Sequence, residues 1–202
     1  MTPTAAPALP IRGIQAGFRR FSVAEYDRMI ANGVLGEDDH LELIEGYLVM
    51  KMPRNPPHDG LLLRLDKMLI RLLPDGWDRR VQMALTLADS VPELDLAIVR
   101  TDPADYTTRH PNPKDFGIVI EVSDSTLDGD RADKGRIYAR AGLPTYWIVN
   151  IADRRVEVYT QPSGPTATAG YARRDDRNLG DHLELVLDGA VVAKFAVADV
   201  FR

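Results

Sequence analysis

Two segments in the middle of the chain are mostly apolar. Leu94–Val99 and Gly117–Val122 contain β-branched residues in short apolar runs, a pattern that predicts buried strands. Asp95 nevertheless lies near the start of the first segment, and Glu121 lies near the end of the second. Burying an ionised carboxylate is costly unless a cation or hydrogen-bond donors meet it. Two carboxylates on neighbouring core strands therefore suggest a divalent metal with oxygen ligands.

Helical periodicity precedes these two segments. Ser22-Val-Ala-Glu25 matches a capping box, which predicts a helix that runs to about Ala31. Apolar positions at helical spacing between Leu61 and Leu72 predict a second helix, which Pro74 ends. The second helix thus has one apolar stripe.

A third helix is expected from about Asp130 to Ala141, where Gly142 and Pro144 end it. Its inward stripe contains Lys134, Ile137, Tyr138 and Ala141. Lys134 thus shares the face that points to the core. A lysine there either extends along its aliphatic stem to solvent or meets a buried anion.

The remaining strands are expected to pair with near neighbours in the chain. Glu45-Gly46 predicts a tight turn between two short strands, and Asp188-Gly189 predicts a terminal hairpin. The expected strands are the two halves of residues 41–50, then 81–87, 146–150, 156–159, 182–187 and 190–195. The predicted fold class is α/β: a mixed central sheet flanked by helices, with a β-rich C-terminal extension.

The length of 202 residues fits one domain with a sizeable core. Residues 1–20 are expected to form a flexible tail and residues 21–202 a single domain. Within that domain, the core spans about 21–160 and the C-terminal β extension spans 171–202. The Pro-rich and polar residues 101–114 predict a long surface loop, a kind of segment that often has a function.

Composition narrows the chemistry. The chain has no cysteine, which excludes disulfides, thiolate metal sites and a cysteine nucleophile. Its net charge of −5 gives no overall attraction for a polyanion, so contacts with nucleic acid must be local. No segment predicts a membrane-spanning helix, and the first residues do not match a secretory signal, so a cytoplasmic protein is expected.

The residues favour a metal-dependent phosphodiesterase. Asp95, Glu121 and the carbonyl of Val122 supply hard oxygen ligands for Mg²⁺, with Mn²⁺ as an alternative ion. Such an ion polarises a phosphoryl oxygen and activates a bound water. Lys134 would hold that water or stabilise the developing charge on phosphate, and Glu42 or Glu45 could complete the site.

Each candidate also has a structural explanation. Asp95 and Glu121 could be solvated at strand ends or paired with arginine, and Glu42 could be an exposed position of an alternating strand. Further candidates for a supporting role are Glu45 (also a turn residue), His58 (also a helix start), Ser123, Asp130 (also a helix N-terminus) and Tyr138 (also a core residue). A serine hydrolase is not supported, because no His/Asp arrangement accompanies Ser123.

Several segments together resemble a known family. They are residues 42–46, His58, residues 92–99, residues 120–126, Asp130, Lys134, Tyr138 and residues 146–149. In this combination they resemble a widespread bacterial family of restriction-endonuclease-like proteins, long known as a domain of unknown function, within the PD-(D/E)XK nuclease superfamily. The resemblance covers about Phe21 to Tyr159.

The resemblance implies a restriction-endonuclease-like fold, a mixed four-stranded core sheet with flanking helices. It gives Asp95 the role of the superfamily's aspartate, Glu121 that of its second acid and Glu42 that of the acid from the first helical region. Where the superfamily pattern has a lysine, this chain has Ser123, and Lys134 from the next helix would replace it.

The resulting prediction is a Mg²⁺-dependent endonuclease that hydrolyses phosphodiester bonds, with DNA as the expected substrate. The alternative is an inactive nuclease-fold module that binds nucleic acid or a protein partner without cleavage. A homodimer is a further expected partner, since cleavage of both strands of a duplex commonly uses two such domains. No membrane partner is expected.

Overall fold

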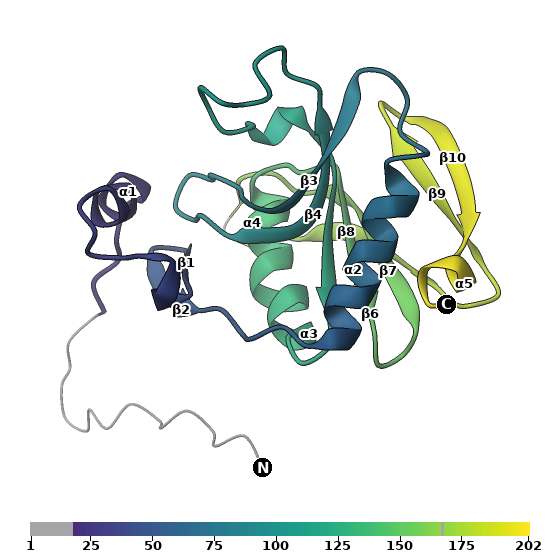
Figure 1. Ribbon diagram of the computed structural model, residues 1–202, viewed down its shortest axis with the longest axis horizontal. Coiled ribbons are helices and arrows are strands. Elements are labelled where there is room, and N and C mark those ends of the chain that lie inside the picture. The colour runs from purple at the N-terminus through teal and green to yellow at the C-terminus, as the bar shows by residue number, and fades with distance from the viewer. Residues whose placement is uncertain (1–17, 167) are drawn as a thin grey trace.

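The computed structural model describes residues 18–166 and 168–202, and a six-stranded mixed sheet forms its centre (Figure 1). The strands lie side by side in chain order: β3 (Trp77–Ala84), β4 (Glu93–Arg100), β5 (Phe116–Ser123), β6 (Thr145–Asn150), β7 (Arg155–Pro162) and β8 (Tyr171–Arg177). Only β5 and β6 run parallel, whereas each other neighbouring pair is antiparallel. The two most apolar segments of the sequence, β4 and β5, therefore occupy the interior of the sheet.

The parallel pair β5–β6 requires a crossover connection, and a helical segment supplies it. This segment covers one face of the sheet, where Ile137 and Tyr138 pack against Val119, Tyr146 and Ile148. Tyr138 and Tyr146 meet edge to face, with ring centroids 5.1 Å apart. The crossover thus places the expected inward stripe against the sheet.

The other face is covered by α2 (Pro56–Leu69), α5 (Val197–Val200) and the hairpin of β9 (His182–Leu187) and β10 (Ala190–Ala196) (Figure 1). Leucines of α2 pack there against apolar side chains of β4, β5 and β6. The helix begins before its apolar stripe, because Asn55 caps it and two prolines occupy its first turn. The C-terminal β extension is therefore part of the core layer.

The first described residues form a smaller unit beside the sheet: α1 (Val23–Ala31), a 3₁₀ turn (Glu37–Asp39), β1 (Leu41–Ile44) and β2 (Tyr47–Met50). The predicted capping box is present at Ser22. Glu45 and Gly46 both have positive φ, of 49° and 82°, as a tight hairpin turn of this kind requires. A bridge between Leu43 and Val91 joins this hairpin to the segment before β4.

The crossover helix differs from the single α-helix predicted from Asp130 to Ala141. It consists of α3 (Leu127–Gly129), a π-helical turn η3 (Asp130–Lys134) and α4 (Gly135–Arg140). The carbonyl of Asp130 accepts from the N–H of Gly135 and also from the Tyr146 hydroxyl at 3.1 Å. This wider turn, here called the π-turn, brings a tertiary hydrogen bond into the helix, which periodicity alone does not predict.

Two other strand predictions were wrong in detail. The predicted strand 81–87 is β3, which instead begins at Trp77 and ends at Ala84, and Gln82 within it has a positive φ of 53°. No strand was predicted over Tyr171–Arg177, yet β8 forms the edge of the sheet there. The sheet consequently has six strands instead of the four that the resemblance implies.

The mixed α/β class, the flanking helices and the C-terminal hairpin are confirmed. The long loop is also largely as expected, since only a 3₁₀ turn (Pro113–Asp115) interrupts it. Among the described residues, no helix combines the length and apolarity needed to cross a membrane.

Candidate active site

A cleft of about 550 Å³ opens between the hairpin unit and the sheet. One wall consists of residues 49–55, from the end of β2 to the residue before α2, and it is called here the connector wall. A second wall comes from residues 124–133, after the end of β5, and Lys134 lies at the base of the cleft. The residues predicted for the site that line this cleft are Glu42, His58, Asp95, Glu121, Val122, Asp130 and Lys134.

Asp95 lies on β4 between two hydrogen-bond donors. Its Oδ2 accepts from the backbone N–H of Val122 at 2.8 Å and lies 3.2 Å from His58 Nε2. Burial alone would raise the pKa of Asp95, but the His58 hydrogen bond and charge outweigh it and leave this pKa below its usual value. The same hydrogen bond raises the pKa of His58. Asp95 is thus held as a carboxylate.

His58 has two roles that the sequence presented as alternatives. Its backbone N–H donates to the Asn55 side chain in the first turn of α2, while its ring reaches Asp95. His58 therefore both starts the helix and contributes to the site, so the two predictions are compatible.

Glu121 is 2% exposed and meets two donors from the crossover helix. Lys134 Nζ lies 3.0 Å from Oε2, and the Tyr138 hydroxyl donates to Oε1 at 2.7 Å. Burial raises the pKa of Glu121 well above its usual value, against the charge of Lys134. Burial lowers the pKa of Lys134, but the charges of Glu121 and Asp130 outweigh it and raise this pKa above its usual value. Lys134 is therefore a cation within a group of acids.

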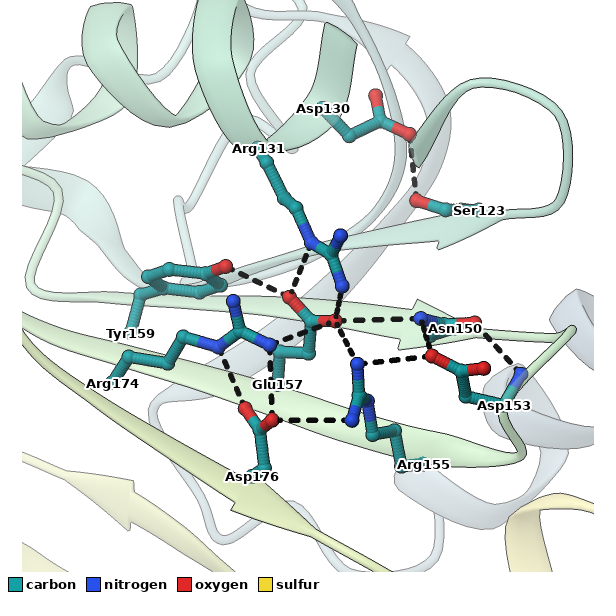
Figure 2. A network of polar contacts seen from close by, with 10 residues as sticks. All are labelled: Ser123, Asp130, Arg131, Asn150, Asp153, Arg155, Glu157, Tyr159, Arg174 and Asp176. Atoms are coloured by element: carbon teal, nitrogen blue, oxygen red, sulfur yellow. Dashed lines mark hydrogen bonds and ion pairs between the residues drawn. The ribbon is translucent and has the colours of Figure 1, made fainter. Parts of the chain in front are cut away.

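Asp130 supports Lys134 from the other side. Its Oδ1 lies 3.8 Å from Lys134 Nζ, and its Oδ2 accepts from the hydroxyls of Ser123 and Thr126, each at 2.6 Å. Ser123 is buried and does not line the cleft; its contact with Asp130 appears in Figure 2. Ser123 thus acts as a donor that orients Asp130.

The two N-terminal acids have different surroundings. Glu42 lines the cleft, and its Oε2 accepts from the backbone N–H of Glu93 at 3.1 Å. Glu45 binds Arg136 at 2.7 Å and Arg140 at 2.9 Å and does not line the cleft. The structure brings Glu42 to the other acids and leaves Glu45 outside.

The donor atoms of the cleft fit a hard divalent cation by their chemistry, since carboxylate and carbonyl oxygens are what such ions bind. The hydrogen bonds to Asp95 within the described chain fall on Oδ2, which leaves Oδ1 for a ligand. Both oxygens of Glu121 have protein partners. Over residues 18–166 and 168–202, no three Asp, Glu, His or Cys side chains are gathered as a set of metal ligands.

Three features of the cleft were missed from the sequence. Lys51 binds the Glu93 carboxylate at 2.7 Å, and the Asn55 side chain donates to Asp124 across the cleft at 2.6 Å. Arg54 also lines the cleft. The proline-rich residues 53–57, which interrupt regular structure just before a predicted site residue, were the available signal.

A second buried carboxylate lies beside the crossover helix (Figure 2). Glu157, on β7, is fully buried and is surrounded by three arginines, Arg131, Arg155 and Arg174. The Tyr159 hydroxyl also donates to it, at 2.8 Å. Burial would raise the pKa of Glu157, but hydrogen bonds from Arg131 and its other partners lower this pKa to about 2.

This network also reaches the candidate site. Arg131 belongs to the π-turn that carries Asp130 and Lys134, and its Nε donates to Glu157 at 3.0 Å. Arg131 lies outside the inward stripe that the sequence predicts for this helix, yet the structure ties it to a buried strand. The π-turn is thus attached to β7 through Arg131 and to β6 through the Tyr146 hydroxyl.

Comparison with known proteins identifies a matching family and a similar solved structure. Residues 23–192 match the model of the family described as "Uma2: Putative restriction endonuclease". A solved structure, described as a putative nuclease belonging to DUF820 from Anabaena variabilis, matches with a TM-score of 0.65. It is 13% identical in sequence, and the match covers 90% of this chain and 97% of that one. No curated protein matches.

The structural likeness, at this low identity, shows the nuclease-like fold. The family match is broader evidence, because it extends from the first described helix into the C-terminal hairpin and so includes the whole cleft. The chain therefore belongs to the Uma2 family of restriction-endonuclease-like proteins.

Proposed function

We propose that this protein is a metal-dependent endonuclease that hydrolyses phosphodiester bonds of DNA in the cleft. The observation that carries the proposal is the convergence of Asp95, Glu121 and Lys134, from β4, β5 and the π-turn, in one cleft. Two acids and one cation at such a place are the groups that phosphodiester hydrolysis uses. Membership of a family described as restriction endonucleases supports the same reaction class.

Asp95, Glu121 and the Val122 carbonyl would hold Mg²⁺ or Mn²⁺, with Glu42 as a further acid beside them. A bound ion of this kind supplies a Lewis acid for the phosphoryl oxygen and lowers the pKa of a water molecule. The remaining contributions come from the protein. His58 and the Val122 N–H fix Asp95 through Oδ2, which would leave Oδ1 to bind the ion.

Lys134 would act on the substrate directly. Its raised pKa keeps it charged, and it can orient the attacking water or stabilise negative charge that develops on phosphate. Tyr138 holds Glu121, while Ser123 and Thr126 hold Asp130, so the surroundings of Lys134 are fixed by hydrogen bonds. A fixed charge of this kind needs little reorganisation during the reaction.

The test is cleavage of supercoiled plasmid, single-stranded DNA and RNA with Mg²⁺, Mn²⁺ or chelator. Wild type and Asp95→Ala are purified identically, with Asp27→Ala, an exposed acid on α1, as the matched control. We expect metal-dependent nicking of DNA by wild type and Asp27→Ala and none by Asp95→Ala. Equal activity in all three proteins would identify a contaminant and contradict the proposal. Cleavage of RNA but not of DNA would show that the substrate is RNA.

A second candidate function is a nuclease-fold module that binds without cleaving. The observation that favours it is the enclosure of Glu121 by Lys134 and Tyr138, which occupies both of its oxygens. Calorimetric titration of wild type and Asp95→Ala with Mn²⁺ separates the two functions. Binding that the substitution abolishes supports the enzyme, whereas absence of binding in wild type supports the module.

Cleavage of both strands of a duplex would be served by a homodimer with two clefts, which is also part of the proposal. Light scattering in solution measures the mass. A mass near 22.5 kDa would mean a monomer and would limit the enzyme to one strand at a time.

A further inference from the structure

The two walls of the cleft carry opposite charges. Lys51 and Arg54 lie on the connector wall, whereas Asp124, Asp130 and Asp133 lie on the second wall. A polyanionic chain is attracted to cations and repelled by carboxylates. A nucleic-acid strand in this cleft would therefore run along the connector wall.

Among the residues that the structure describes, Arg54 is the cation on that wall without an ion-pair partner. Lys51 pairs with Glu93, and Lys134, at the base of the cleft, pairs with Glu121. Arg54 is exposed, and no ion pair joins it to another residue within 18–166 and 168–202. Its guanidinium is thus available for a phosphate, which it can bind through two parallel hydrogen bonds.

The connector wall also exposes two large apolar side chains, Met50 at 75% and Met52 at 61%. They alternate with Lys51 at the end of β2 and just beyond it. Methionine is flexible and polarisable, and its sulfur makes favourable contacts with aromatic rings. Apolar side chains next to cations, along a path for a phosphate backbone, suit bases that are not stacked in a duplex.

The low exposure of the reactive groups also favours a single strand over a duplex. Asp95 is 18% exposed, Lys134 is 17% exposed and Glu121 is 2% exposed. The cleft that contains them, of about 550 Å³, has the size of a pocket for a small molecule. Duplex DNA is stiff, with a persistence length of about 150 base pairs, so bringing its backbone into such a space requires a costly local bend or kink. A single strand can bend one phosphate inward.

We propose that the connector wall binds an unpaired nucleic-acid strand, with Arg54 on a backbone phosphate and Met50 and Met52 against the bases. This inference rests on the proposed function, because it takes the cleft as the place where a phosphodiester is held. It adds that the substrate is single-stranded, or a duplex opened locally.

The test is the fluorescence anisotropy of a labelled 12-nucleotide single strand and of the matching duplex, in chelator and at several salt concentrations. The variants are Arg54→Ala and the double change Met50→Ser with Met52→Ser. Arg71→Ala and Met83→Ser are the matched controls, since both residues are exposed and neither lines the cleft. Circular dichroism checks that each variant is folded.

Wild type is expected to bind the single strand at least about tenfold more tightly than the duplex, the gain of one or two base contacts. Arg54→Ala should reduce the salt slope for the single strand by about 0.7, the value for one lost phosphate contact. The methionine double variant should weaken single-strand binding by about twofold to tenfold without changing that slope. Both controls should match wild type.

Duplex binding as tight as single-strand binding, or no binding of either, would overturn the inference. It would also fail if Arg71→Ala weakened binding as much as Arg54→Ala. These outcomes are independent of the proposed function, because no metal is present and no cleavage is measured. If wild type binds the single strand but shows no metal-dependent nicking, the proposed reaction is contradicted and the binding inference is not.

Discussion

Glu121 and Glu157 are both buried carboxylates on strands of the same sheet, yet their surroundings differ. Glu121 meets one lysine and one tyrosine hydroxyl, and burial raises its pKa well above its usual value. Glu157 meets three arginines together with Tyr159, and its pKa falls to about 2. Burial is common to both residues, so the difference arises from the number and kind of donors around each.

This difference separates a structural carboxylate from a chemical one. The partners of Glu157 come from β7, β8 and the π-turn, and they neutralise its charge. Glu121 faces a cleft and shares its single cation with Asp130, so its charge is only partly compensated. A carboxylate in that state favours a further cation, whereas Glu157 has no need of one.

The largest expected effect is on catalysis at Glu121. Glu121→Gln keeps the shape of the side chain and removes its charge, so we expect cleavage to fall at least about 100-fold. Stability should change less than for Glu157→Gln, because the glutamine still accepts a hydrogen bond from Tyr138 and Lys134 keeps Asp130 as an acid partner. Plasmid nicking gives the rate and thermal unfolding gives the stability. Full activity in Glu121→Gln would show that Glu121, like Glu157, has only a structural role.

Glu157→Gln should show the reverse. Loss of the charge leaves Arg131, Arg155 and Arg174 without their common partner, and we expect the free energy of unfolding to fall by about 3 kcal/mol. Urea unfolding measures it. Glu184→Gln, which breaks the exposed pair with Lys194, is the control and should cost about 0–1 kcal/mol. A loss for Glu157→Gln no greater than the control would contradict this prediction.

Acid should destabilise the protein through Glu157. Its pKa is lowered from 4.5 to about 2 in the folded state, so its stabilising contribution is present above about pH 4.5 and disappears as the pH falls toward 2. Linkage gives a contribution of about 3 kcal/mol. Urea unfolding at pH 5, 4 and 3 should therefore show a steeper loss of stability for wild type than for Glu157→Gln. Parallel curves would refute the assignment.

The smallest expected effect concerns the attachment of the π-turn. Tyr146→Phe removes the hydrogen bond to the Asp130 carbonyl, and Tyr171→Phe removes a similar bond, to the Leu143 carbonyl. Each change should cost about 1 kcal/mol in unfolding. Only Tyr146→Phe should also lower the cleavage rate, because Asp130 and Lys134 share the π-turn. Equal rates in the two variants would show that this hydrogen bond has no influence on the site.

The sequence by itself determined the features that depend on local pattern. Apolar runs defined β4 and β5, and the Glu45-Gly46 and Asp188-Gly189 turns defined two hairpins, because positive φ at such positions suits few residues. The spacing of the crossover helix placed Lys134 on its inward face. Two acids on buried strands were enough to suggest the site, and the structure lines one cleft with both.

Other features were decided by contacts between residues far apart in the chain. β8 is highly charged and exists as a strand because it pairs with β7, where Arg174 reaches Glu157. The π-turn accepts a hydrogen bond from the Tyr146 hydroxyl, and His58 lies beside Asp95 and lowers its pKa. Periodicity reports which side of an element is buried, but not which partner it meets there. Only the tertiary structure could therefore distinguish Glu121 from Glu157.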